Sequence, residues 1–133
     1  PELFEAMAQV ATLPDSVVYL HRDDRYPGRC VVATKRHVRE LYDLEDAERD
    51  GYLRDVARVA AAIRDAVSPD KINYAVYGDL FPHLHFHLVP KRRGGRDWGA
   101  PFVANPPRWS WLPEPEVARL VDALRDHLKV AGG

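Results

Sequence analysis

Three histidines alternate with apolar residues in the segment His83-Leu84-His85-Phe86-His87-Leu88-Val89. In an extended strand, this spacing of two places the three imidazoles on one face and the apolar side chains on the other. Each imidazole carries a donor and an acceptor, and a buried polar group without a partner costs about 1–3 kcal/mol. Because packing does not explain such a row, we interpret His83, His85 and His87 as functional residues, with three incidental surface histidines as the alternative.

A strand of this kind can act on a small charged group. Side chains that neighbour each other on one strand face lie about 6.5–7 Å apart at Cα, so they can reach adjacent atoms of one target. A phosphoryl group is such a target, and imidazole can serve there as a nucleophile or a proton donor near neutral pH. We expect His85 to lie nearest the middle of the cleft. Strand histidines are also good zinc or iron ligands, which leaves a metal-binding protein as an alternative.

Composition limits the classes of partner. The 133 residues fit one domain, 1–133, and 46% of them are hydrophobic. The net charge of -1 predicts no general attraction to nucleic acid or membranes. Cys30 is the only cysteine, which rules out an internal disulfide and is typical of a reducing compartment. No apolar run reaches membrane-spanning length, so we expect a cytoplasmic protein.

Helical and strand patterns alternate along the chain. The spacing of Leu3, Phe4, Met7, Val10 and Ala11 predicts a short first helix, and Asp43 is the expected N-cap of a long helix. The predicted elements after the first helix are strands 17–21 and 29–34, a helix 43–67, strands 72–77 and 83–89, and a helix 116–129. This order indicates an α+β fold with a mostly antiparallel sheet, although a crossover through the long helix could leave one pair parallel.

The histidine segment resembles the His-x-His-x-His-x-x signature of the histidine-triad (HIT) nucleotide hydrolases and transferases. Residues 26–38, which run from Tyr26-Pro27-Gly28 to Lys35-Arg36-His37-Val38, resemble the upstream strand of that family. The long helix and Trp98 also fall where the family has them. The resemblance covers about residues 15–100, and within the family the chain looks most like the bacterial branch described as dinucleoside-polyphosphate hydrolases.

The resemblance implies a HIT-like fold and a reaction. The fold would be a sheet of about five strands with one long helix and a C-terminal helix, with its core in residues 15–100 and an extension and helix in residues 101–130. His85 would attack the α-phosphorus of a nucleotide, such as diadenosine tetraphosphate or a nucleoside phosphoramidate, and form a nucleotidyl-histidine intermediate. His87 would contact a phosphate oxygen or the leaving group, and His83 would support the orientation of His85.

The family comparison also carries expectations about cofactors, partners and the substrate-binding residues. No metal cofactor is required, although a magnesium-bound polyphosphate substrate remains possible. The partner would be a nucleotide, and the protein would be a homodimer, which a stripe of exposed apolar residues on the long helix would fit. The expected substrate-binding residues are His21, Arg29, Tyr77 and Trp98.

Three departures from the family pattern concern substrate selection. The fourth histidine of the family is Arg29 here, which cannot accept a hydrogen bond but is suited to binding phosphate directly. The usual ribose-binding Asp or Asn aligns with His21, and the short loop 78–82 lacks the usual polar phosphate contacts. These changes keep a third possibility open, a nucleotide-binding module without catalysis.

Overall fold

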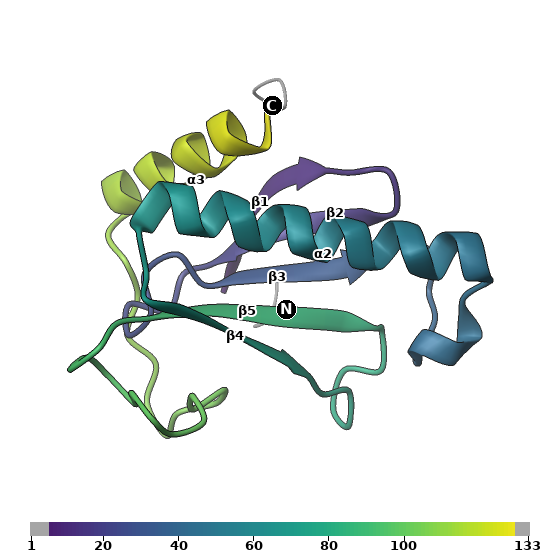
Figure 1. Ribbon diagram of the computed structural model, residues 1–133. Coiled ribbons are helices and arrows are strands. Elements are labelled where there is room, and N and C mark those ends of the chain that lie inside the picture. The colour runs from purple at the N-terminus through teal and green to yellow at the C-terminus, as the bar shows by residue number, and fades with distance from the viewer. Residues whose placement is uncertain (1–5, 130–133) are drawn as a thin grey trace.

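Five strands form one antiparallel sheet in the computed structural model, which describes residues 6–129. Their order across the sheet is β1-β2-β3-β5-β4, and every neighbouring pair is antiparallel (Figure 1). The α+β fold with about five strands is therefore confirmed, and the possible parallel pair does not occur. The strands are β1 (Met7–Thr12), β2 (Ser16–His21), β3 (Cys30–Thr34), β4 (Lys71–Val76) and β5 (His85–Lys91).

The predicted first helix is wrong where the structure describes it, because Met7–Thr12 forms strand β1. Leu3 and Phe4 lie outside the described residues. The register of β1 against β2 shifts between Gln9 and Ala11, and Val10 and Ala11 are both buried. An irregularity of this kind breaks the alternation of a strand. Two adjacent residues are then both apolar and buried, as residues on the apolar face of a helix are.

The long helix begins three residues later than predicted. Helix α2 spans Asp46–Val67, and Glu45 is its N-cap, with a reciprocal capping box between Glu45 and Glu48. Asp43, the predicted N-cap, lies instead in a short 3₁₀ helix, η1 (Leu41–Asp43). The helix ends at Ser68, which adopts the left-handed conformation.

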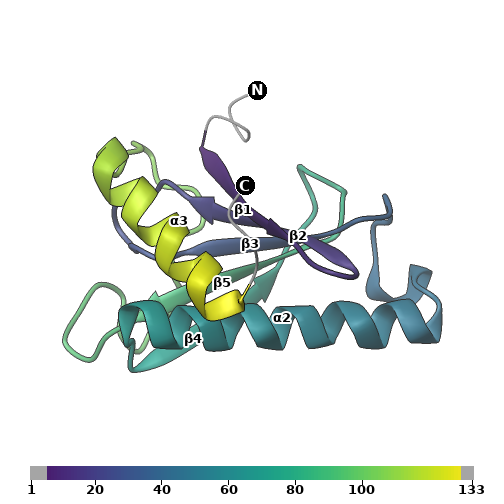
Figure 2. The ribbon, with the colours of Figure 1, turned by 90° about the horizontal axis from the view of Figure 1, so that it is seen from above.

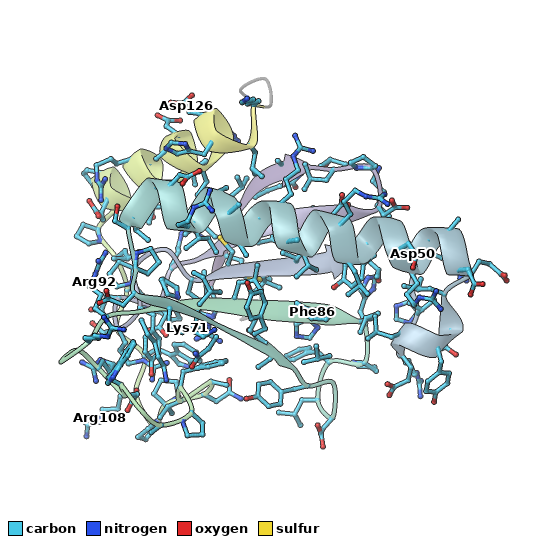
Figure 3. The ribbon with its side chains drawn as sticks, in the orientation of Figure 1. Asp50, Lys71, Phe86, Arg92, Arg108 and Asp126 are labelled. Carbon is cyan, nitrogen blue, oxygen red and sulfur yellow. The ribbon has the colours of Figure 1, made fainter. Side chains whose placement is uncertain are left out.

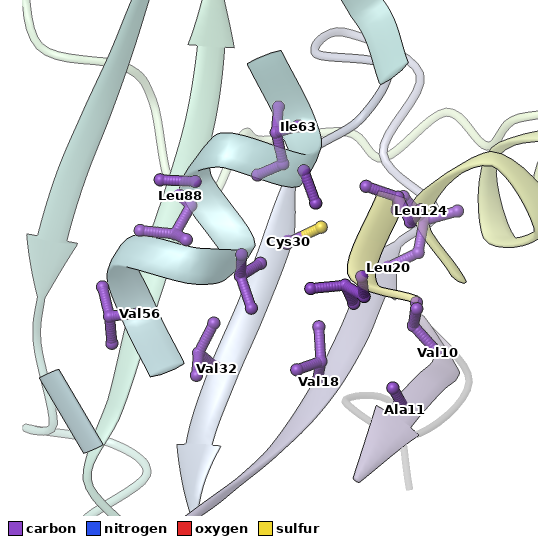
Figure 4. Packing of buried hydrophobic residues seen from close by; sticks show 14 of the residues in the cluster. Val10, Ala11, Val18, Leu20, Cys30, Val32, Val56, Ile63, Leu88 and Leu124 are labelled. Atoms are coloured by element: carbon purple, nitrogen blue, oxygen red, sulfur yellow. The ribbon is translucent and has the colours of Figure 1, made fainter. Parts of the chain in front are cut away.

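Helices α2 and α3 (Glu114–Leu128) cover one face of the sheet (Figure 2). Their apolar faces meet side chains of all five strands in a single core, in which Figure 4 labels Val10, Ala11, Val18, Leu20, Cys30, Val32, Val56, Ile63, Leu88 and Leu124. The expected exposed apolar stripe on the long helix is not found, because Leu53 is the only large hydrophobic residue of α2 that is exposed. Among residues 6–129, no helix is long and apolar enough to cross a bilayer.

The chain crosses from β3 through α2 to the edge strand β4 and returns as β5 between them. This topology places the histidine strand inside the sheet. Within residues 6–129 no helix covers the opposite face of the sheet, and Phe102, from the segment after β5, joins Tyr26 and Val89 in a second, smaller core there. Figure 3 labels Phe86 on β5, and Arg92 and Arg108 in the segment that follows it. The helix-free face carries the site.

Candidate active site

Strand β5 presents two of the three histidines on the helix-free face. His87 pairs with Val31 and His85 with Ala33, whereas Phe86 and Leu88 belong to the core under the helices. The expected alternation of imidazole and apolar side chain is therefore confirmed from residue 85 onward. The rings of His85 and His87 lie 5.0 Å apart in an edge-to-face arrangement.

His83 differs from the prediction, because β5 begins at His85 and His83 lies in the bend before it. Its Nε2 lies 2.6 Å from the carbonyl oxygen of Thr34, and its Nδ1 lies 3.0 Å from Nδ1 of His37. The backbone at Leu84 is held on both sides, by the carbonyl of Val38 and the amide of Thr34. The side chain of His83 thus ties the turn before β5 to the end of β3 and is directed away from the other two histidines.

His85 is oriented by the backbone of His83. Its Nδ1 lies 2.6 Å from the carbonyl oxygen of His83, and a carbonyl only accepts, so Nδ1 is the donor. In neutral imidazole one nitrogen carries the hydrogen and the other a lone pair. The lone pair of His85 is therefore on Nε2, as a nucleophile requires.

A cleft of about 940 Å³ lies over these histidines, a volume typical of small-molecule sites. The structure brings most of the expected residues to it, since His21, Arg29, Tyr77, His85 and His87 all line the cleft. The short loop 78–82 forms part of the same wall. Trp98 does not line the cleft. It is 39% exposed, and the guanidinium of Arg93 lies 5.7 Å from its ring centroid.

Arg29 lies beneath the cleft with 1% of its surface exposed. Its Nη1 donates to Asp23 Oδ2 at 3.0 Å, its Nη2 contacts His87 Nδ1 at 3.3 Å, and both nitrogens reach the carbonyl of Ala104 at 3.4 Å. Arg25 completes the arrangement, since its Nη2 donates to Asp23 Oδ2 at 2.7 Å. These contacts occupy both terminal nitrogens of Arg29, so its direct binding of phosphate would require them to break.

Asp23 was not identified from the sequence, although it is fully buried between two guanidinium groups. Burial acts to raise the pKa of its carboxyl, but the hydrogen bonds and charges of Arg25 and Arg29 outweigh burial and hold that pKa below its usual value. The available signal was the position of Asp23 in the acidic and basic connector between the first two predicted strands. Its partners, however, depend on how that connector folds.

His21 stands at the end of β2 against two tryptophans. The ring of Trp109 stacks on His21 at 5.2 Å, and Trp111 stacks on Trp109 at 5.3 Å with an interplanar angle of 4°. A β-bridge between Asp23 and Trp111 attaches this late segment to the connector after β2. Both tryptophans line the cleft, a role that the sequence did not predict for them.

Two histidines of the cleft are held neutral. Burial is the main cause that lowers the pKa of His87 to about 3, followed by the charges of Arg29, His85 and His21. Burial likewise lowers the pKa of His21 to about 3, with Arg29 as the next cause. The amide of Asp23 donates to Nδ1 of His21, so this ring presents its other nitrogen as a donor.

A metal site was the main alternative interpretation of the histidine strand. Within residues 6–129, no group of three or more His, Cys, Asp or Glu side chains is arranged to hold a metal ion. The imidazoles instead contact the backbone, an arginine and one another.

Comparisons with known proteins agree with this geometry. A family model described as HIT domain matches residues 5–94. "Protein hit" of Bacillus subtilis (strain 168) is 30% identical over 78 residues, which are 55% of this chain and 54% of that protein, so the chain spans about half the length of this curated relative. The crystal structure of a histidine triad protein from Bradyrhizobium japonicum matches with a TM-score of 0.87 and 28% identity, over 96% of this chain and 94% of that one.

A hypothetical histidine triad nucleotide-binding protein from Sulfolobus tokodaii shares the fold, with a TM-score of 0.73 and 20% identity over 92% of this chain and 84% of that one. The HIT domain model covers well over half of the 133 residues, including both cleft histidines of β5. This chain belongs to the HIT domain family.

Proposed function

We propose that this protein is a nucleotide hydrolase or nucleotidyl transferase that acts at the α-phosphate through a covalent intermediate on His85. The observation that carries the proposal is the hydrogen bond from His85 Nδ1 to the carbonyl of His83, which leaves the Nε2 lone pair for attack. The proposed substrate class is carried over from the resemblance of the sequence to the bacterial branch described as dinucleoside-polyphosphate hydrolases.

The reaction has two displacements at phosphorus. His85 Nε2 attacks the α-phosphorus, and the bond to the leaving group breaks with its electron pair. The resulting nucleotidyl-histidine carries the hydrogen on Nδ1, where the carbonyl of His83 stabilises the positive charge of the ring. Water then attacks phosphorus, the P–N bond returns its electrons to Nε2, and a nucleoside monophosphate and a proton are released.

The cleft offers separate walls for the two ends of a nucleotide. His87, beside His85, presents a ring nitrogen to the phosphate or leaving group, and the stacked rings of His21, Trp109 and Trp111 provide a flat aromatic surface. Aromatic surfaces of this kind stack on bases at about 1–3 kcal/mol per base. We therefore place the base or the leaving nucleoside against this stack.

The test is turnover of a substrate panel that contains diadenosine tetraphosphate, adenosine 5′-phosphoramidate and adenosine 5′-phosphosulfate. In His85→Asn we expect nucleotide binding to persist while turnover falls by more than about 10³-fold, because the nucleophile is removed. His127→Asn, on α3, is the matched control and should retain full activity. Intact-mass analysis of the quenched wild-type reaction should show one added nucleoside monophosphate, and full turnover by His85→Asn would refute the proposal.

Chelation separates this proposal from the metal-binding alternative. If the strand histidines act as a nucleophile and a donor, EDTA-treated protein retains turnover of adenosine 5′-phosphosulfate, which has no polyphosphate chain for magnesium to neutralise. Loss of that activity in EDTA, with recovery on adding zinc or iron, would favour a metal site. Binding of nucleotides without turnover of any panel member would favour the non-catalytic module.

A further inference from the structure

Arg29 determines which nitrogen of His87 carries the hydrogen. Its Nη2 lies 3.3 Å from His87 Nδ1, and a guanidinium group can only donate. Nδ1 of His87 must therefore be the acceptor. A neutral imidazole with its lone pair on Nδ1 carries its hydrogen on Nε2, which leaves that N–H to face the substrate.

The guanidinium cannot easily move away from this position. It is buried, Asp23 holds Nη1, and the carbonyl of Ala104 lies within 3.4 Å of both terminal nitrogens. Arg25 holds Asp23 in turn through Nε and Nη2. Removing one member of such a buried ionic group is costly, so the orientation of Arg29 is set by the fold rather than by the substrate.

We propose that Arg29 is a positioning residue that fixes His87 as a neutral Nε2–H donor, and that this restricts the enzyme to leaving groups that depart as anions. The inference rests on the proposed function and narrows its substrate class to nucleotide anhydrides, such as dinucleoside polyphosphates, over phosphoramidates. The general-acid role that a histidine next to a nucleophile can play is absent here.

The proton balance explains the restriction. When a P–O bond of an anhydride breaks, the electron pair leaves on a phosphate oxygen that is stable as an anion, and a hydrogen bond from His87 Nε2–H is sufficient. When a P–N bond breaks, the nitrogen must gain a proton to leave as an amine. A neutral imidazole beside Arg29 has no spare proton to transfer, so it cannot protonate the leaving amine of a phosphoramidate. The leaving phosphate of an anhydride needs no such proton.

The surroundings of His87 oppose a second proton on it. Three groups lower its pKa in addition to burial: Arg29, which directly precedes β3, His85 on β5 and His21 on β2. Tyr77 and Phe102 close the remaining sides, with ring centroids 5.8 Å and 6.2 Å from that of His87. None of these residues supplies a negative charge that would stabilise an imidazolium.

Imidazole NMR of the wild-type protein tests the tautomer without any substrate. Long-range ¹H–¹⁵N spectra should place the hydrogen of His87 on Nε2 and show no titration of this ring between pH 8 and pH 5. A hydrogen on Nδ1, or a titration near pH 6.5, would overturn the inference even if the enzyme is active.

Kinetics test the consequence with two substrates that share the adenosine α-phosphate. General-acid assistance contributes about 10²–10⁴-fold where it operates. We therefore expect the wild-type kcat/KM for diadenosine tetraphosphate to exceed that for adenosine 5′-phosphoramidate by about 100-fold or more. Equal values, or a preference for the phosphoramidate, would contradict the restriction, whereas no turnover of either substrate would contradict the proposed function instead.

Variants test whether Arg29 is responsible. The double variant Arg29→Met/Asp23→Asn removes the guanidinium without leaving its carboxylate partner charged. In this variant the preference for the anhydride should shrink about 10-fold or more, and the pH profile of kcat should gain an ionisation near neutrality. Arg93 is exposed and does not line the cleft, so Arg93→Met should keep the wild-type ratio of the two kcat/KM values. An unchanged ratio in the folded double variant would refute the role of Arg29, and if that variant does not fold, the NMR result on the wild type decides.

Discussion

At the scale of single residues, the three histidines of the motif contribute different atoms. In the proposed reaction, His85 contributes the lone pair of Nε2, His87 an N–H, and His83 a backbone carbonyl that orients His85. The His83 side chain itself contacts Thr34 and His37 rather than the cleft. One motif therefore combines two side-chain functions with one main-chain function.

This division predicts unequal effects of substitution within the motif. His83→Ala keeps the carbonyl that accepts from His85 but loses the hydrogen bond to Thr34, so we expect turnover to fall by no more than about 10-fold while stability drops by about 1–2 kcal/mol. Steady-state kinetics and urea unfolding measure the two quantities. A loss of activity as large as that in His85→Asn would show that the His83 side chain takes part in the chemistry.

The two neutral histidines predict acid sensitivity. Their folded pKa values of about 3 lie below the ordinary value of 6.5, so between these limits the unfolded chain binds more protons and the free energy of unfolding falls as the pH falls. Stability should be complete above about pH 6.5 and should decrease by roughly 2–4 kcal/mol between pH 7 and pH 5. Urea titrations at several pH values measure this slope, and in His87→Asn it should be about half as steep. A flat profile above pH 5 in the wild type would contradict the prediction.

At the scale of elements, helix α2 is fastened to the turn between β1 and β2. Asp55 on α2 is buried, and its Oδ2 accepts from the amide of Asp15 at 2.9 Å and from the hydroxyl of Ser16 at 2.8 Å. Gly51, one turn earlier, lies so close to Asp15 that a Cβ there would be 2.1 Å from Oδ2. Gly51 therefore marks a close packing contact between α2 and this turn.

Removing the carboxylate of Asp55 should weaken this junction. Asp55→Ala leaves two donors without their acceptor, each at about 1–3 kcal/mol, so we expect a loss of roughly 2–4 kcal/mol in the free energy of unfolding. Asp50→Ala, on the exposed side of the same helix, should change stability by less than about 0.5 kcal/mol. Similar unfolding midpoints for the two variants would show that the junction contributes little.

At the scale of the whole molecule, the exposed apolar side chains gather at the edge of the sheet rather than on α2. Tyr74 and Val76 on β4 are 52% and 41% exposed, and within the described residues β4 pairs with β5 alone. An unpaired edge strand that carries apolar side chains is a site for pairing with another chain. This edge is therefore where we expect the second copy of a homodimer to bind.

Light scattering after size-exclusion chromatography should give twice the chain mass for the wild type. Val76→Glu places a charge on the edge and should shift the equilibrium toward monomer by at least about 10-fold in Kd, since a buried unpaired charge is costly. Tyr42→Glu, on the exposed η1, is the control and should remain dimeric. A monomeric wild type, or an unaffected Val76→Glu dimer, would contradict this interface.

The local pattern of the chain predicted most elements and singled out the histidines of the candidate site. Alternation predicts β5, helical spacing predicts α2 and α3, and the motif spacing singles out His83, His85 and His87, because each signal depends on neighbours only a few residues apart. The motif spacing does not separate His83 from the two histidines that line the cleft. The same local reasoning misjudged β1, whose register shift makes two adjacent residues face the core. It also placed the start of α2 at Asp43, since several acidic residues there are plausible caps.

Only the tertiary structure decided the surroundings of the two histidines. A bridge joins Asp23 to Trp111, nearly 90 positions later, and Arg29 contacts His87 on a strand 58 positions away, whereas Trp98 does not line the cleft. Such contacts have no local signal, because they depend on the path of the connector after β2 and of the segment after β5. The sequence by itself thus singled out the histidines to which the proposed chemistry is assigned. The fold decided the hydrogen-bond partners of two of them, a carbonyl beside His85 and a buried guanidinium beside His87.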